Sequence, residues 1–180
     1  MSDDHAKIVR LLSERWVLAL STIGADGPYT TPLFYTVDAE ETAADRHGPR
    51  LLFVSDPTTK HGHMLGEGPT LVSGATYLES RDISELRGVQ LRGYVSHQRL
   101  FCASETSRLT SLYLRAHPVA RAALESTSPP SLYVLEVTWA KLTDNRLGFG
   151  THRTVAYPYS KRSPDGNADD NSDDNDTRSR

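Results

Sequence analysis

Six short stretches of apolar or alternating residues, separated by turn-forming residues, decide the fold class of this chain. Trp16 to Ile23 and Tyr29 to Val37 flank the turn Ala25-Asp26-Gly27-Pro28, which indicates a two-stranded hairpin. Four further strands are expected over 50–55, 70–78, 85–98 and 132–137, the last continuing to Trp139. The strands follow one another mostly without crossover helices, which disfavours a doubly wound parallel sheet.

Helical patterns are fewer. Apolar residues at helical spacing predict a short amphipathic helix over 4–14 that covers one end of the core, and a single turn or two over 58–65. A longer helical pattern over 102–125 is interrupted at His117-Pro118. Closing six antiparallel strands into a barrel removes exposed strand edges, so we expect a mainly β fold: a six-stranded antiparallel barrel with flanking helices.

The chain of 180 residues suits one domain, which we place at 1–158. Residues 159–180 are expected to be a disordered acidic tail, because six aspartates and almost no apolar residues occur after residue 162. Residues 1–162 then hold 17 acidic and 18 basic residues. A body so close to neutral does not favour nucleic-acid binding.

Composition also bears on location. The single cysteine, Cys102, allows no disulfide within the chain and no cysteine-based zinc site. The longest apolar run, Trp16 to Leu20, is much shorter than the roughly 20 residues that cross a bilayer, and the polar beginning lacks the pattern of a signal peptide. We therefore expect a cytoplasmic protein without a membrane association.

An anion site is suggested where the third strand passes into the short helix. Ser55, Thr59, Lys60 and His61 gather hydroxyls, a cation and an imidazole at a helix start, where backbone N–H groups favour a phosphate. The same residue types are ordinary helix caps, so the pattern alone leaves both interpretations open.

Two other patterns are less specific. In the segment Arg87 to Gly93, Gln90 or Arg92 could face a ligand, although an antiparallel strand with one solvent face has the same alternation. His61 and His63 would point about 200 degrees apart on a helix, with no third ligand suitably spaced, so no metal site is predicted.

Several segments together resemble the pyridoxamine 5'-phosphate oxidase-like, FMN-binding split-barrel superfamily. They are Pro32 to Tyr35, Thr59-Lys60-His61 with Met64, Arg87 to Gly93, and Leu142 to Gly150. Within it the chain is most similar to the uncharacterised bacterial YhbP-like branch, through Tyr113, Pro118-Val119-Ala120-Arg121 and Thr143 to Gly150.

The resemblance implies a six-stranded antiparallel split barrel that forms a homodimer, with FMN in each of two clefts between the subunits. The matching phosphate positions are Thr59, Lys60 and His61, with Ser55 beside them. Backbone groups of Pro32, Leu33, Phe34 and Tyr35 would lie along the flavin ring, and Gln90 is a further contact by strand position.

The functional hypothesis is an FMN-dependent oxidoreductase that acts on a small molecule. In such a protein the flavin performs the redox chemistry, so no catalytic side chain is assigned. The chain lacks the longer C-terminal region that the oxidase proper uses for its substrate, so vitamin B6 oxidation is not expected. A non-catalytic flavin- or haem-binding module, or a reductase that uses the deazaflavin F420, are the alternatives.

Overall fold

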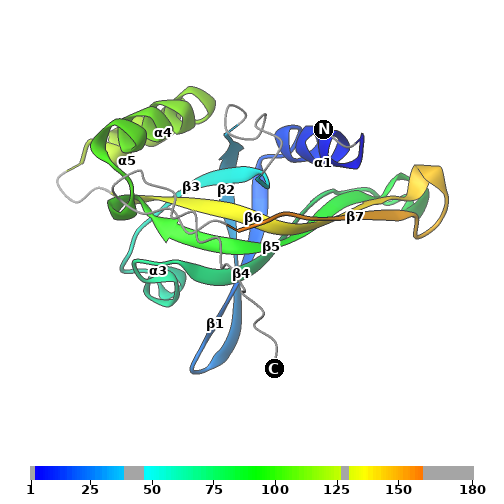
Figure 1. The fold of residues 1–180 in the computed structure, drawn as a ribbon, viewed down its shortest axis with the longest axis horizontal. Helices are drawn as coiled ribbons and strands as arrows, with labels where there is room; N and C mark the ends of the chain where they lie inside the picture. The colour runs from blue at the N-terminus through cyan, green and yellow to red at the C-terminus, as the bar shows by residue number, and fades with distance from the viewer. Residues whose placement is uncertain (1–2, 39–46, 127–129, 160–180) are drawn as a thin grey trace, which may run out of the picture.

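The computed structural model describes residues 3–38, 47–126 and 130–159 (Figure 1). Within them, seven strands form one antiparallel sheet in the order β3-β2-β1-β4-β5-β6-β7. Their bounds are β1 (Val17–Gly24), β2 (Gly27–Val37), β3 (Arg50–Ser55), β4 (Thr70–Leu78), β5 (Arg87–His97), β6 (Ser131–Asp144) and β7 (His152–Ala156). The mainly β, antiparallel fold is therefore confirmed. From residue 160 onward the expected acidic tail lies outside the described residues.

Pairing of β3 with β6 closes the first six strands into a barrel. The first half of β6 pairs with β3 from Ser131 to Glu136, and its second half pairs with β7 from Trp139 to Thr143. The strand β7 lies outside the six-stranded ring and was not expected from the sequence. Four of its five side chains are exposed, so it carries no alternation of buried and exposed residues.

The helices are α1 (Asp3–Ser13), α3 (Lys60–Leu65), α4 (Ala103–Ala116) and α5 (Arg121–Leu124). Four short 3-10 turns connect other elements: η1 (Ile83–Glu85), η2 (Gln98–Leu100), η3 (Pro118–Ala120) and η4 (Asn145–Leu147). The predicted interruption at His117-Pro118 is the boundary between α4 and η3, because proline cannot continue the hydrogen-bonded helix.

Two apolar clusters stabilise the fold. The larger one fills the barrel, and α1 contributes Ile8, Leu11 and Leu12 to it, so this helix covers the core as expected. A smaller cluster joins α4 to the outside of β3 and β6, through Leu52, Leu109, Tyr113, Leu132 and Val134. Figure 1 shows α4 and α1 lying apart on the same side of the sheet.

The strands β2 and β3 pair along only part of their length, so the barrel is not fully closed between them. The two strands pair only at Tyr35–Phe53, Thr36–Leu52 and Val37–Leu51, although β2 is 11 residues long. Among the described residues, no strand pairs with β2 between Gly27 and Phe34 on the side away from β1. We refer to this side of residues 28–34 as the open edge of β2.

The last sequence motif, Thr143 to Gly150, forms the turn between β6 and β7. Asn145 is buried there, and its amide donates to the Ile83 carbonyl at 2.8 Å and accepts from the Gly150 N–H at 3.1 Å. Gly148 has a φ of 126°, which favours glycine over any residue with a Cβ. The motif therefore holds the β6–β7 turn against η1.

Candidate functional site

The Ser55–His61 segment ends β3 and begins α3. The Ser55 hydroxyl lies 2.5 Å from His61 Nε2, and Thr59 Oγ1 lies 3.3 Å from the same nitrogen. Thr59 is the N-cap of α3, since its hydroxyl oxygen accepts from the Gly62 N–H at 3.2 Å. Three of the four predicted phosphate residues are thus held together, but by contacts that also serve the helix start.

Charge in this segment comes from Lys60. Burial of the imidazole lowers the pKa of His61 below its ordinary value of 6.5, so this histidine is neutral at pH 7. The Lys60 ammonium is half exposed, 3.7 Å from an Asp26 carboxylate oxygen and 5.1 Å from the centre of the Tyr29 ring. Of the predicted phosphate residues, Lys60 alone contributes a full positive charge.

Side chains of the predicted ring-binding strand alternate between its two faces. Leu33 packs against the main core, and Tyr35 is buried with its hydroxyl donating to the Leu12 carbonyl at 2.6 Å. Burial raises the pKa of Tyr35 to about 12, which keeps its hydroxyl protonated. Pro32 and Phe34 face outward, and the Phe34 side chain is 61% exposed.

Backbone groups of this strand alternate in the same way. The Tyr35 N–H donates to the carbonyl of Trp16, the residue just before β1, at 3.0 Å. In an antiparallel strand, neighbouring residues direct their N–H and C=O groups to opposite sides. The peptide groups of Thr30, Pro32 and Phe34 therefore face the open edge of β2, where the expected ring contacts would be made.

Gln90 lies further away. It belongs to the cross-strand row Pro32–Ala19–Ala75–Gln90, in which two strands separate it from Pro32. Neighbouring strands are spaced about 4.8 Å apart, so Gln90 and Pro32 lie roughly 14 Å apart on the outer face of the sheet. Its exposed side chain belongs to this face and not to the Ser55–His61 segment.

His117 is a neighbour of β2 that the sequence did not assign to the site. Its Nε2–H donates to the Tyr35 carbonyl at 3.0 Å, and its ring contacts those of Trp16, Phe34 and Tyr113. The helix break before Pro118 marked this position, but gave no reason to expect the fold to bring it to β2. The cluster leaves Trp16 59% exposed beside Phe34.

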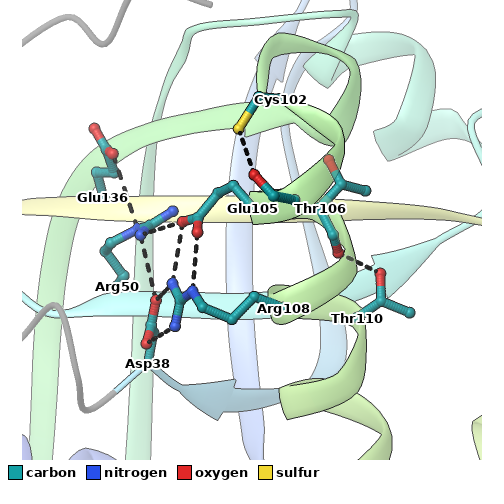
Figure 2. Close-up of polar contacts among 9 residues, drawn as sticks. Asp38, Arg50, Cys102, Glu105, Thr106, Arg108, Thr110 and Glu136 are labelled. Atoms are coloured by element: carbon teal, nitrogen blue, oxygen red, sulfur yellow. Dashed lines mark hydrogen bonds and ion pairs between the residues drawn. The ribbon is translucent and has the colours of Figure 1, made fainter. Parts of the chain in front are cut away.

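A charged network fastens the beginning of α4 to the barrel (Figure 2). Arg108 donates to both carboxylate oxygens of Asp38, at 3.0 and 2.7 Å, and also contacts Glu105. Arg50 donates to Glu105 at 3.0 Å and to Asp38 at 3.3 Å, and lies 4.0 Å from Glu136. Asp38 and Arg50 are almost completely buried, so this network fixes α4, and with it His117, beside β2.

The described residues form neither the metal site nor the membrane-spanning helix that was considered from the sequence. His61 is buried and His63 exposed, and the part of the chain that the structure describes contains no group of three or more residues that could hold a metal ion. Among its helices, none is both long and apolar enough to span a membrane.

Comparison with known proteins places the chain in a family. No family model matches it. However, it is 30% identical over 148 residues to a UPF0306 protein of Yersinia pseudotuberculosis, covering 82% of this chain and 90% of that protein. A UPF0306 protein of Klebsiella pneumoniae is 30% identical over 145 residues, covering 81% and 88%. The chain belongs to the UPF0306 family.

Solved structures share the fold at low identity. A haem-binding protein from Mycobacterium smegmatis has a TM-score of 0.65 at 18% identity, covering 85% of this chain, which spans only 57% of that protein. An FAD-binding protein from the same organism has a TM-score of 0.54 at 14% identity, covering 88% and 98%. An FAD-binding protein from Mesorhizobium loti has a TM-score of 0.56 at 16% identity, covering 75% and 88%.

Proposed function

We propose that this protein binds FMN along the open edge of β2 and acts as a flavin-dependent oxidoreductase on a small molecule. The observation that carries the proposal is the incomplete pairing of β2 with β3, next to the Ser55–His61 segment. Similar folds occur in proteins described as FAD-binding and haem-binding, which supports a cofactor in this barrel.

The residues present fit a flavin. The open edge offers the Thr30 and Phe34 N–H groups and several carbonyls, and a flavin ring edge has both acceptors and a donor to match them. Lys60 supplies one cation for the phosphate. Because His61 is neutral, we expect the phosphate to depend on Lys60.

When bound, the flavin would supply the redox chemistry by accepting a hydride or electron pair and passing it on. The chain's own part is to bind and orient that group. The charged network and His117 hold α4 against β2, which keeps the open edge in a fixed position. Trp16 and Phe34 provide an apolar, partly exposed surface beside it.

We also propose that the protein is a homodimer with the cofactor between its subunits. The outer face of β1, β2, β4 and β5 has the small or apolar residues Ala19, Ala75 and Pro32 in its central row, and Gln90 and Arg92 are its large polar side chains on β5. Its larger apolar side chains are 42 to 77% exposed: Val17, Ile23, Phe34, Leu71 and Tyr77. Exposed apolar side chains gathered on one face of a sheet fit a self-complementary partner better than solvent.

Within the split-barrel superfamily, we propose that the chain is a YhbP-like protein. The supporting segments are Pro118-Val119-Ala120-Arg121 and Thr143 to Gly150. The second of these forms the hydrogen-bonded turn at Asn145, a local structure that depends on those residue types.

The test of the cofactor is the visible absorption spectrum of freshly purified protein, repeated after adding FMN and removing the unbound fraction. Mass spectrometry then identifies what remains. A two-band flavin spectrum near one per subunit supports the proposal, and bleaching by NADH or NADPH supports turnover. A Soret band would identify haem as the cofactor in place of FMN, and retained F420 would identify F420. A bound flavin that neither NADH nor NADPH bleaches would indicate a binding module without turnover. A colourless protein that binds none of them contradicts the proposal.

Lys60→Ala tests the phosphate contact. We expect it to weaken FMN binding by about 1.5 to 3 kcal/mol, because a charged hydrogen bond would be lost. Fluorescence titration with FMN measures the change.

Arg121→Ala is the control for this experiment. Arg121 is 61% exposed and paired with Glu125, whereas Lys60 is 51% exposed and paired with Asp26. Equal FMN affinity in the two variants would contradict a phosphate site at Lys60.

A further inference from the structure

A cleft of about 440 Å³ lies between α1, the start of β5 and the β6–β7 turn, and none of the predicted flavin-binding residues lines it. Figure 1 shows the β6–β7 turn at the opposite end of the molecule from α3, and α1 on the other side of the sheet from α3. Leu11 and Leu142 give the cleft an apolar lining. Five side chains that are positive at pH 7 also line it: Lys7, Arg10, Arg87, Arg146 and Arg153.

Carboxylates offset part of this charge. Glu14 and Asp144 line the cleft, and Asp3 and Asp4 pair with its rim. Arg10 contacts Glu14 at 3.0 Å, and Arg146 holds both oxygens of Asp144. The Arg10–Glu14 pair is largely exposed, so it contributes little and leaves Arg10 able to contact a ligand. The Asp144 side chain is 15% exposed and stays bound to Arg146 through two hydrogen bonds.

Arg87 differs from the other four cations. Its side chain is only partly exposed, and its Nε is buried with no hydrogen-bond partner among the described residues. A buried guanidinium N–H without an acceptor is costly, so native structures normally provide one. Arg153 is 63% exposed and lies 3.7 Å from Asp4, which leaves it able to turn toward a ligand.

We propose that this cleft binds a small organic phosphate, with the phosphate group at Arg87 and Arg153 and an apolar body against Leu11 and Leu142. A volume of about 440 Å³ is within the usual range for small-molecule sites. A phosphate brings up to two charges and three strong acceptor oxygens, and arginine matches it with paired donors. A ligand with a single carboxylate would carry less charge and fewer acceptor oxygens, so its attraction to the arginines would offset less of the repulsion from Glu14 and Asp144.

Phenyl phosphate is a suitable probe, since it combines a dianion with a small apolar body. Calorimetric titration of the full chain, as purified, would compare it with inorganic phosphate and with phenol. We expect phenyl phosphate to bind more tightly than inorganic phosphate, and phenol not to bind. Arg87→Gln and Arg153→Gln should each weaken its binding at least tenfold, while Arg121→Gln should leave it unchanged. Arg121 is an exposed arginine on α5 that pairs with Glu125, so it controls for loss of charge alone.

The outcomes separate this cleft from the flavin site. Arg153→Gln changes an exposed residue, so it keeps the test valid should Arg87→Gln fail to fold. Absence of phenyl phosphate binding at millimolar concentration overturns the proposal, as does binding that both arginine variants leave intact. Binding that is lost in Lys60→Ala, or that expels a bound flavin, would assign the anion to the flavin site and equally overturn it. Failure of FMN to bind does not affect any of these readings.

Discussion

At the scale of single residues, buried charge decides how α4 is held. Glu105 accepts hydrogen bonds from Arg108 and Arg50, which lower its pKa from 4.5 to about 2. Folding therefore favours the ionised form. The stabilisation from this group is complete above about pH 4.5 and is lost as the pH falls toward 2.

Glu105→Gln should consequently destabilise the protein by about 1 to 2 kcal/mol at neutral pH, a figure reduced for the partial exposure of the group. The difference from the parent should shrink as the pH approaches about 3, where Glu105 of the unfolded chain is protonated. Urea denaturation at both pH values measures it.

Glu125→Gln is the control, because Glu125 pairs with Arg121 at the surface. We expect this control to change stability little at either pH. If Glu105→Gln lowers the free energy of unfolding by the same amount at both pH values, folding does not lower the pKa of Glu105.

At the scale of elements, close approach of β5 and β6 depends on a glycine. The register of these strands shifts between Arg92 and Gly93. A Cβ on Gly93 would lie 2.1 Å from the Glu136 carbonyl oxygen, so the backbone of β6 itself occupies that space. A larger residue would have to push the two strands apart.

Gly93→Ala should therefore destabilise the protein by about 2 to 4 kcal/mol, through overpacking against backbone that has little freedom to move. Thermal unfolding followed by circular dichroism measures the loss. Ser96→Ala, on the same strand, should behave like the parent. A Gly93→Ala protein as stable as the parent would show that β5 and β6 separate easily at this bulge.

How far the sequence predicts these elements depends on the range of the interactions involved. The first hairpin, α1 and the break at His117-Pro118 follow from local periodicity and from proline chemistry. By contrast, Asp38 and Arg108 are 70 positions apart, and no local pattern indicates that they meet. For the candidate site, the strand-to-helix pattern over 55–61 correctly predicts that Ser55, Thr59 and His61 lie together. Gln90 lies apart from them, and nothing in the sequence indicated that His117 contacts β2.

At the scale of the whole molecule, the outer face of β1, β2, β4 and β5 is the surface we propose for dimerisation. Leu71 is 61% exposed on this face. Leu71→Arg should give a monomer, because a charge placed in an apolar interface must be desolvated. Sedimentation equilibrium measures the mass.

Ile83→Arg controls for the effect of adding a positive charge. Ile83 is 63% exposed on η1, away from the proposed interface, so this variant should stay dimeric. A monomeric parent protein, or a dimer that survives Leu71→Arg, would contradict dimerisation through this face.

The open edge of β2 also bears on how the chain avoids aggregation. Unpaired strand edges invite other chains to add as further strands. The backbone groups of Pro28 and Pro32 face the open edge, as do those of Thr30 and Phe34. Because proline has no N–H, the open edge presents a donor only at Thr30 and Phe34 within residues 28–34. Another strand could therefore form few hydrogen bonds to this edge.

The double variant Pro28→Thr with Pro32→Thr should aggregate more readily on warming than the parent, because it restores two N–H donors to the open edge. Light scattering measures the aggregation, and equal scattering would show that these prolines do not protect the edge.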